Sequence, residues 1–239
     1  MRAAHQQALA ANGGKPSRES LGYLVTLSST LVYTGDSAGG REVAKEALDG
    51  YRALGLAETA DGIGALNNLA FANIVGGDMA AAAELSAEAW ALRKRLYPKS
   101  ANTVAVGINH AFMVAQLGQL DEARQIGEQV LQMAVDNIGV DSRHAMSARV
   151  LLIEIEIKAG QAAAAMALLN EQQLHAPKLQ LSPLEQAANL RQSGIVYMAN
   201  GQSARARQEL QAAEKMLLDI GPGGAEQLKA VRVWMEKLP

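Results

Sequence analysis

The residues best suited to chemistry form a glycine-rich run around one serine. Gly35-Asp36-Ser37-Ala38-Gly39 matches the pattern G-x-S-x-G, in which a strained turn between a strand and a helix exposes a nucleophilic serine. Attack on an ester also needs a base, an acidic partner and a glycine-rich loop that stabilises the oxyanion. No His-Gly-Gly-type loop precedes the motif, and no later strands are expected to carry the partners. An esterase that uses Ser37 is therefore only a remote alternative.

Other candidate groups for catalysis or ligand binding are weaker still. Gly13-Gly14-Lys15-Pro16 lacks the glycine spacing of a phosphate-binding loop, and proline follows the lysine. The four histidines are far apart and lack the i,i+4 spacing of a helical metal pair; they are His5, His110, His144 and His175. With no cysteine in the chain there is no thiolate nucleophile. We expect no catalytic residue, no metal and no cofactor.

The charge balance limits the classes of partner. The 239 residues carry a formal net charge of −2, and the Lys and Arg residues form no local run. A basic surface of the kind that nucleic-acid binding requires is therefore not expected. The first residues lack the apolar stretch of a signal peptide, and no apolar run approaches the roughly 20 residues that span a bilayer. The sequence predicts a cytoplasmic protein without a membrane or nucleic-acid partner.

Regularly spaced glycines indicate the elements that position all of these residues. Successive members of the set lie 42, 41, 42 and 41 residues apart, and they are Gly35, Gly77, Gly118, Gly160 and Gly201. A fixed period of this length is typical of a chain built by repeating one unit. Because Gly35 belongs to the set, the serine motif lies at a turn between helices.

Each of these glycines separates two segments of helical length. We expect first helices near residues 18–34, 59–76, 101–117, 142–159 and 183–200, and second helices near 37–54, 78–96, 120–137, 161–174 and 202–219. A small residue recurs five positions after each glycine, and four of the five residues seven positions before it are also small. Small residues on both sides of a turn let two helices pack closely as a hairpin.

These residues resemble the tetratricopeptide repeat, and the period near 42 resembles its kinesin-light-chain-like variant. The best match is Leu66-Asn67-Asn68-Leu69-Ala70, followed by Gly77-Asp78 and Ala82. The sequence departs from the family pattern at Gly40 and Gln172, where alanine is usual. The resemblance covers residues 18 to 219 and implies an all-α fold, a right-handed α-solenoid of five stacked helical hairpins with a leading unpaired helix and a C-terminal capping helix.

Three segments are expected along the chain. Residues 1–14 read as the second helix of a truncated preceding repeat plus a linker, 15–221 as the five repeats and 222–239 as the capping helix. In the last segment Leu228, Val231, Met235 and Leu238 fall on one helical stripe, as a solenoid cap requires. A chain that starts in mid-repeat is expected to be the C-terminal part of a longer protein.

The resemblance also implies that the first helices line a concave, peptide-binding face. Phe71 and Phe112, the only phenylalanines in the chain, both lie six residues before their glycines, and Asn68 and Asn109 both lie nine before. Asparagine can pair with the backbone of an extended peptide, and Asn67 adjoins this set. Alternatively, the phenylalanines fill space between first helices and the asparagines satisfy turns between repeats.

Charged residues occur on this face only in the last two expected first helices, at Glu154, Lys158 and Arg191. Lys158 and Arg191 could bind an acidic group of a partner, although Glu154 and Lys158 also form an i,i+4 pair of the kind that is common on solvated helices.

The predicted function is a non-enzymatic scaffold for a peptide or protein segment, as the sensory or adaptor part of a larger bacterial regulatory protein. The alternative is an intramolecular module whose groove holds a segment of its own N-terminal region and controls an attached kinase or DNA-binding domain. An unpaired first helix that exposes apolar surface also favours self-association as a homo-oligomer.

Overall fold

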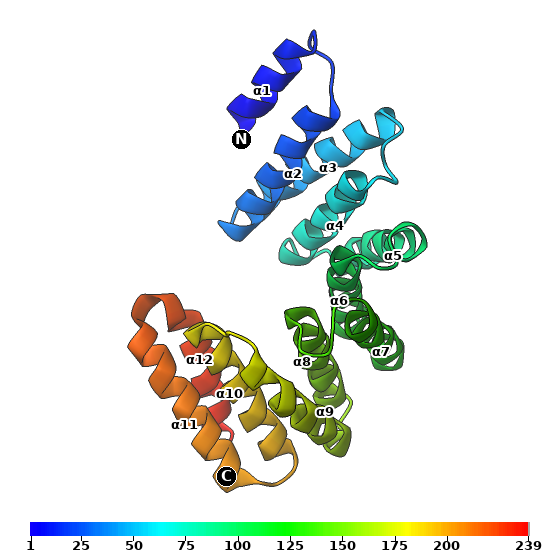
Figure 1. Ribbon diagram of the computed structural model, residues 1–239. Coiled ribbons are helices and arrows are strands. Elements are labelled where there is room, and N and C mark those ends of the chain that lie inside the picture. Colours follow the sequence, from blue (N-terminus) through cyan, green and yellow to red (C-terminus); the bar gives the residue numbers. More distant parts are fainter. Residues whose placement is uncertain (239) are drawn as a thin grey trace. The chain divides into compact units, whose positions relative to one another are not determined.

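The computed structural model describes residues 1–238, and all regular structure in this range is helical (Figure 1). The α-helices in chain order are α1 (Arg2–Ala11), α2 (Arg18–Tyr33), α3 (Ser37–Ala53), α4 (Ala60–Val75), α5 (Met79–Leu96), α6 (Ala101–Gln116), α7 (Leu120–Asn137), α8 (Arg143–Lys158), α9 (Ala162–His175), α10 (Pro183–Ala199), α11 (Ser203–Ile220) and α12 (Ala225–Glu236). Short 3₁₀ turns, Ala176–Lys178 and Gly221–Gly224, follow α9 and α11. The helix ranges expected from the glycine spacing agree with these bounds to within one or two residues, and the all-α repeat fold is confirmed.

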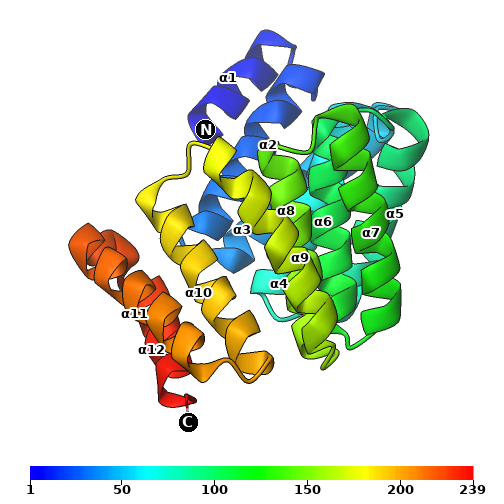
Figure 2. The ribbon, with the colours of Figure 1, turned by 60° about the horizontal axis from the view of Figure 1, so that its bottom comes forward.

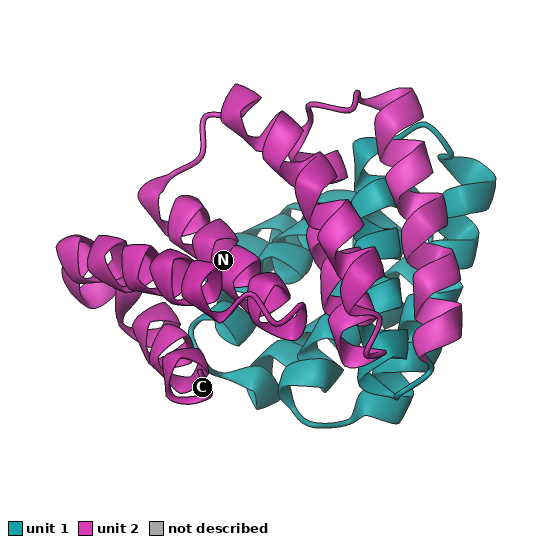
Figure 3. Cartoon of the chain, turned by 90° about the horizontal axis from the view of Figure 1, so that it is seen from below, with its two compact units in different colours: residues 1–119 teal, residues 120–239 magenta. Residues whose placement is uncertain are grey.

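The chain divides into two compact units, residues 1–119 and 120–239 (Figure 3). Unit 1 contains α1 to α6 and unit 2 contains α7 to α12. Within unit 1, α3 packs against α2 and α4, and α5 packs against α4 and α6; within unit 2, α11 packs against α10 and α12 (Figure 2). The division between units falls between Gln119 and Leu120, where the turn after α6 meets the start of α7.

The five regularly spaced glycines end the first helices in a left-handed conformation. Their φ angles are 94° at Gly35, 84° at Gly77, 81° at Gly118, 71° at Gly160 and 72° at Gly201. In each turn the next residue donates its backbone N–H to a carbonyl five residues earlier, as Asp78 does to Asn73 at 2.8 Å. A residue with a Cβ atom is strained at such a φ, which explains the glycine at each repeat.

Small residues bring the two helices of a hairpin together, as expected. Ala70 and Ala82 are fully buried in one cluster with Met113, and Ala165 is fully buried beside Ile153. The departure at Gly40 has a packing reason, because a Cβ at this position would lie 2.4 Å from Val32 Cγ2. The first hairpin is therefore closed more tightly than alanine would allow.

The two ends of the array also follow the sequence. In α12, Val231 is fully buried against Leu210 and Leu217 of α11, and a partly buried apolar set packs around it. This set includes Leu228, Trp234, Met235 and Leu238, so the expected capping stripe is confirmed. At the other end, α1 packs on α2, where the His5 ring Nδ1 lies 2.8 Å from the carbonyl oxygen of Ser20. None of the helices described in residues 1–238 is long and apolar enough to cross a membrane.

Candidate functional sites

The serine motif lacks the geometry of a nucleophile elbow. Ser37 is the first residue of α3, and the segment before it is helix α2 rather than a strand. The Asp36 carboxylate accepts the backbone N–H of Gly39 at 2.8 Å and caps α3. The helix expected near residues 18–34 is therefore confirmed, and the motif is the turn of the first hairpin.

The histidines contact different partners in different parts of the fold. His110 is buried in α6 with Nδ1 2.8 Å from the hydroxyl of Ser86. His175 Nδ1 lies 2.6 Å from Asp141, which also accepts from Lys178 at 3.0 Å. Within residues 1–238 no group of three or more His, Asp or Glu side chains is arranged to hold a metal ion.

The first helices of unit 1 present aromatic residues at their C-terminal halves. Phe71 of α4 is half-buried and lies beside Tyr33 of α2, with ring centroids 5.8 Å apart and planes tilted by 40°. Tyr33 is 79% exposed, and Phe112 of α6 is half-buried. Phe71 thus contacts a neighbouring first helix and still leaves part of an aromatic pair open to solvent.

Three asparagines of α4 and α6 lie in an amide network between first helices. Asn68 Nδ2 donates to the Val25 carbonyl at 3.0 Å and to the Ser29 hydroxyl at 2.8 Å, both on α2. Asn109 Nδ2 donates to Asn67 Oδ1 at 3.4 Å. The donors of Asn68 and Asn109 thus join neighbouring repeats, while all three side chains remain partly exposed.

The same contact recurs in unit 2. Gln192 of α10 also lies nine residues before its turn glycine, and its Nε2 donates to the Val150 carbonyl of α8 at 3.0 Å. Val150 and Val25 occupy the same position, ten residues before their glycines. Gln192 Oε1 in turn accepts from the buried Gln172 at 3.1 Å, which explains a second departure from alanine.

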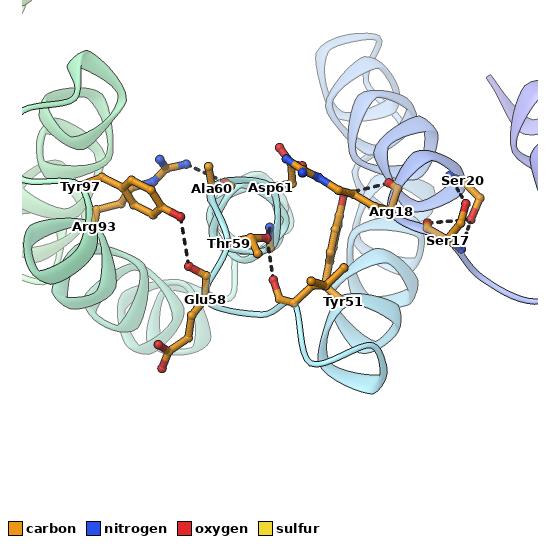
Figure 4. Close-up of polar contacts among 12 residues, drawn as sticks. Ser17, Arg18, Ser20, Tyr51, Glu58, Thr59, Ala60, Asp61, Arg93 and Tyr97 are labelled. Carbon is orange, nitrogen blue, oxygen red and sulfur yellow. Dashed lines mark hydrogen bonds and ion pairs between the residues drawn. The ribbon is translucent and has the colours of Figure 1, made fainter.

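A second set of polar contacts holds the N-terminal ends of the first helices α2 and α4 in unit 1 (Figure 4). Arg93, sixteen residues after its glycine, donates to the Ala60 carbonyl at 2.8 Å, and Tyr51, at the same position of the preceding repeat, donates to the Arg18 carbonyl at 3.5 Å. The exposed pair of Arg18 and Asp61 joins α2 to α4 at 2.6 Å. Sequence reasoning missed this set, although the shared position of Tyr51 and Arg93 could have revealed it.

In unit 2, one pocket is lined by all three of the charged residues that we expected on the face of the first helices. Glu154 and Lys158 come from α8 and Arg191 from α10, and the cavity volume is about 250 Å³. The rest of the lining is Ile153, Ile157, Gln192, Ile195 and, from the capping helix, Trp234. Trp234 packs on the α11–α12 core and also forms a wall of the pocket.

The electrostatics of this pocket centre on Glu154. The surrounding protein disfavours the charged carboxylate and raises its pKa above the ordinary value, while the positive charges of Arg191 and Lys158 act in the opposite direction. The Nε–H of Arg191 is buried, and no acceptor for it is found in the described chain. A second pocket of about 220 Å³ shares Glu154, Arg191 and Gln192 and extends toward Met146 and Ser147.

The expected groove residues therefore fall into two sets, one in each unit. Unit 1 holds the uncharged set Asn67, Asn68, Phe71, Asn109 and Phe112, and unit 2 holds Glu154, Lys158 and Arg191 around one pocket.

Comparisons with known proteins identify the fold. The sequence matches no protein-family model and no curated protein. Among solved structures, BtubC (BKLC) from P. vanneervenii aligns with a TM-score of 0.76 at 18% identity over 92% of this chain and 89% of that chain. A Podosopora anserina protein assigned as a kinesin light chain, with nearly identical TPR-like repeats, aligns with a TM-score of 0.71 at 20% identity over 83% and 94%. YrrB, a TPR protein with an unusual peptide-binding site, aligns with a TM-score of 0.53 at 14% identity over 95% and 98%. The chain therefore has the fold of tetratricopeptide-repeat proteins, including those of the kinesin-light-chain-like type.

Proposed function

We propose that this protein is a non-enzymatic interaction scaffold that binds an extended, uncharged segment of protein chain on the first helices of unit 1. The observation that carries the proposal is the open aromatic pair of Tyr33 and Phe71 on a face without charge. After Glu19 in α2 and Asp61 in α4, and throughout α6, these helices contain no Asp, Glu, Lys or Arg. A charged partner would lose hydration there without gaining an ion pair.

The asparagines add hydrogen-bonding capacity to this face. The Oδ1 atoms of Asn68 and Asn109 and the Nδ2 of Asn67 have no partner among the described residues. The two acceptors lie one repeat apart and the donor lies next to one of them in the sequence, and together they can pair with N–H and C=O groups of an extended chain, whatever its sequence. YrrB, whose repeats have the same fold, has a peptide-binding site, which supports peptide recognition as the kind of function.

The wider context is part of the same proposal. The segment would come from another protein or from a larger protein that contains this chain, with the scaffold as a sensory or adaptor part of a bacterial regulatory system. A cytoplasmic location, and self-association through the exposed apolar residues, complete the proposal.

Selection from a library of random linear peptides against the immobilised chain tests the function. Enriched peptides should carry apolar or uncharged polar residues, and Tyr33→Ser and Phe71→Ala should each weaken their binding by about tenfold, because buried aromatic contacts dominate peptide affinity. Val233→Ser in α12 is the matched control, since Val233 is also an exposed apolar residue. The proposal fails if no peptide is enriched, or if both unit 1 variants fold normally and bind the selected peptides as the unchanged protein does.

A further inference from the structure

The pocket of unit 2 differs from the face of unit 1 in shape and in charge. Its apolar walls are Ile153, Ile157, Ile195 and Trp234, and its polar groups are Glu154, Lys158, Arg191 and Gln192. At about 250 Å³ it lies below the range of roughly 300–1,000 Å³ that is usual for drug-sized ligands. A single small molecule or a single side chain would fill it.

The walls are held by the protein core. Ile153 is 1% exposed in a cluster with Ala165, Leu169 and Val196, and Ile157 packs against the same cluster. Trp234 packs against the separate core of α11 and α12. The apolar part of the pocket is therefore formed before any ligand arrives, which lowers the entropic cost of binding.

The polar groups carry both signs of charge on one side of these walls. Glu154, an exposed residue, contributes a carboxylate to the lining. Arg191 contributes a guanidinium whose buried Nε–H has no acceptor in the described chain, and Lys158 adds a second positive charge. A ligand that brings only a carboxylate would compete with Glu154 for Arg191 and Lys158, whose charges already act on that side chain, and a ligand that brings only a cation would meet Arg191 and Lys158.

We propose that this pocket binds a free α-amino acid with a large apolar side chain. The α-ammonium group pairs with Glu154, the α-carboxylate pairs with Arg191 and Lys158, and the side chain packs against Ile157, Ile195 and Trp234. The zwitterion satisfies both signs of charge at once, which neither an interior peptide residue nor a simple carboxylic acid can do. This ligand site is separate from the peptide-binding face proposed for unit 1.

The indole N–H resonance of Trp234 gives a local readout. Titration of the whole chain with L-leucine, L-isoleucine and L-phenylalanine should shift this NMR signal saturably, while the signal of Trp90, a buried residue of unit 1, stays in place. Trp234→Phe identifies the resonance. N-acetyl-L-leucine lacks the ammonium charge and L-leucinamide lacks the carboxylate, and each should bind at least about tenfold more weakly than L-leucine.

Variants of the charged groups complete the test. Glu154→Gln and Arg191→Met should each weaken L-leucine binding by about tenfold or more, while Arg18→Met, which removes an exposed arginine of unit 1, should leave it unchanged. Circular dichroism establishes that each variant is folded. If none of the three amino acids shifts Trp234, or if N-acetyl-L-leucinamide binds as tightly as L-leucine, the proposal is overturned, and the second outcome would assign the pocket to an interior residue of a peptide. Neither result bears on peptide selection by unit 1.

Discussion

Asp141 connects the turn before α8 to the end of the same hairpin. Its carboxylate lies 2.6 Å from His175 Nδ1 and 3.0 Å from Lys178 Nζ. The hydrogen bond with His175, and then that with Lys178, hold the pKa of Asp141 below its ordinary value. Because the ionised Asp141 carboxylate is more favourable in the folded protein than in the unfolded chain, it stabilises the fold when it is charged.

The sign of this shift predicts an acid-dependent contribution to stability. The stabilisation is complete above the unfolded pKa of about 3.9 and is lost as the pH falls through the lower folded value. Asp141→Asn should therefore lower the thermal unfolding midpoint at neutral pH, and the difference from the unchanged protein should shrink below about pH 4. Melting curves of both proteins from neutral to acidic pH measure it. A difference that stays constant across this range would contradict the argument.

At the scale of the element, side-chain amides join consecutive first helices. The bond from Gln192 to the Val150 carbonyl and the bond from Asn68 to the Val25 carbonyl occupy the same position in the repeat. Gln192 is buried and also accepts from Gln172 of α9. It therefore links three helices, α8, α9 and α10, through one side chain.

Replacing one amide of this network should lower the free energy of unfolding more than replacing both Gln172 and Gln192. Gln192→Leu leaves the buried Gln172 side chain with only its longer hydrogen bond to Asn189 Oδ1, at 3.3 Å, and we expect a loss of about 1–3 kcal/mol in the free energy of unfolding. In the double variant Gln172→Leu/Gln192→Leu both buried amides are replaced by apolar groups, so part of that loss should be recovered. Chemical denaturation of the single and double variants measures the coupling. Strictly additive effects would show that the two amides act independently.

The hairpins could be predicted from the sequence because their signals are local and repeated. Gly77 and its counterparts mark turns that require a positive φ, and Ala70 and Ala82 mark the close contact between the helices of a hairpin. The amide network could not be predicted in the same way. The residue type of Asn68 does not reveal that its Nδ2 bonds the carbonyl of Val25, because this contact depends on the placement of α2 beside α4.

The unit 2 pocket illustrates a second limit. Glu154, Lys158 and Arg191 could be assigned to one face because they follow the repeat period. Trp234 lies outside the repeats, on a helix that has no counterpart in the period, so its position beside Ile157 and Ile195 depends on how α12 packs against α11. Periodicity thus assigned the three charged residues to one face, and it carried no information about the aromatic wall of the pocket.

For the molecule as a whole, the two units have different surfaces on their first helices. In unit 1 the sequences of α2, α4 and α6 carry charge only in the first turns of α2 and α4. In unit 2, α8 and α10 carry acidic and basic residues along their length, including the buried Arg149 and Glu156. The first helices of the two units thus differ in the chemistry of their surfaces, which is why separate ligands are proposed for them.

The stability of such an array should also be local, because each repeat gains most of its stability from its nearest neighbours. Gly77 in unit 1 and Gly201 in unit 2 occupy the same turn, with φ angles of 84° and 72°. Alanine at either position must adopt a conformation that costs about 1–2 kcal/mol. Gly77→Ala should reduce hydrogen-exchange protection mainly in α4 and α5, and Gly201→Ala should reduce it mainly in α10 and α11. If either substitution instead lowered protection equally along residues 1–238, the chain would unfold as one cooperative block.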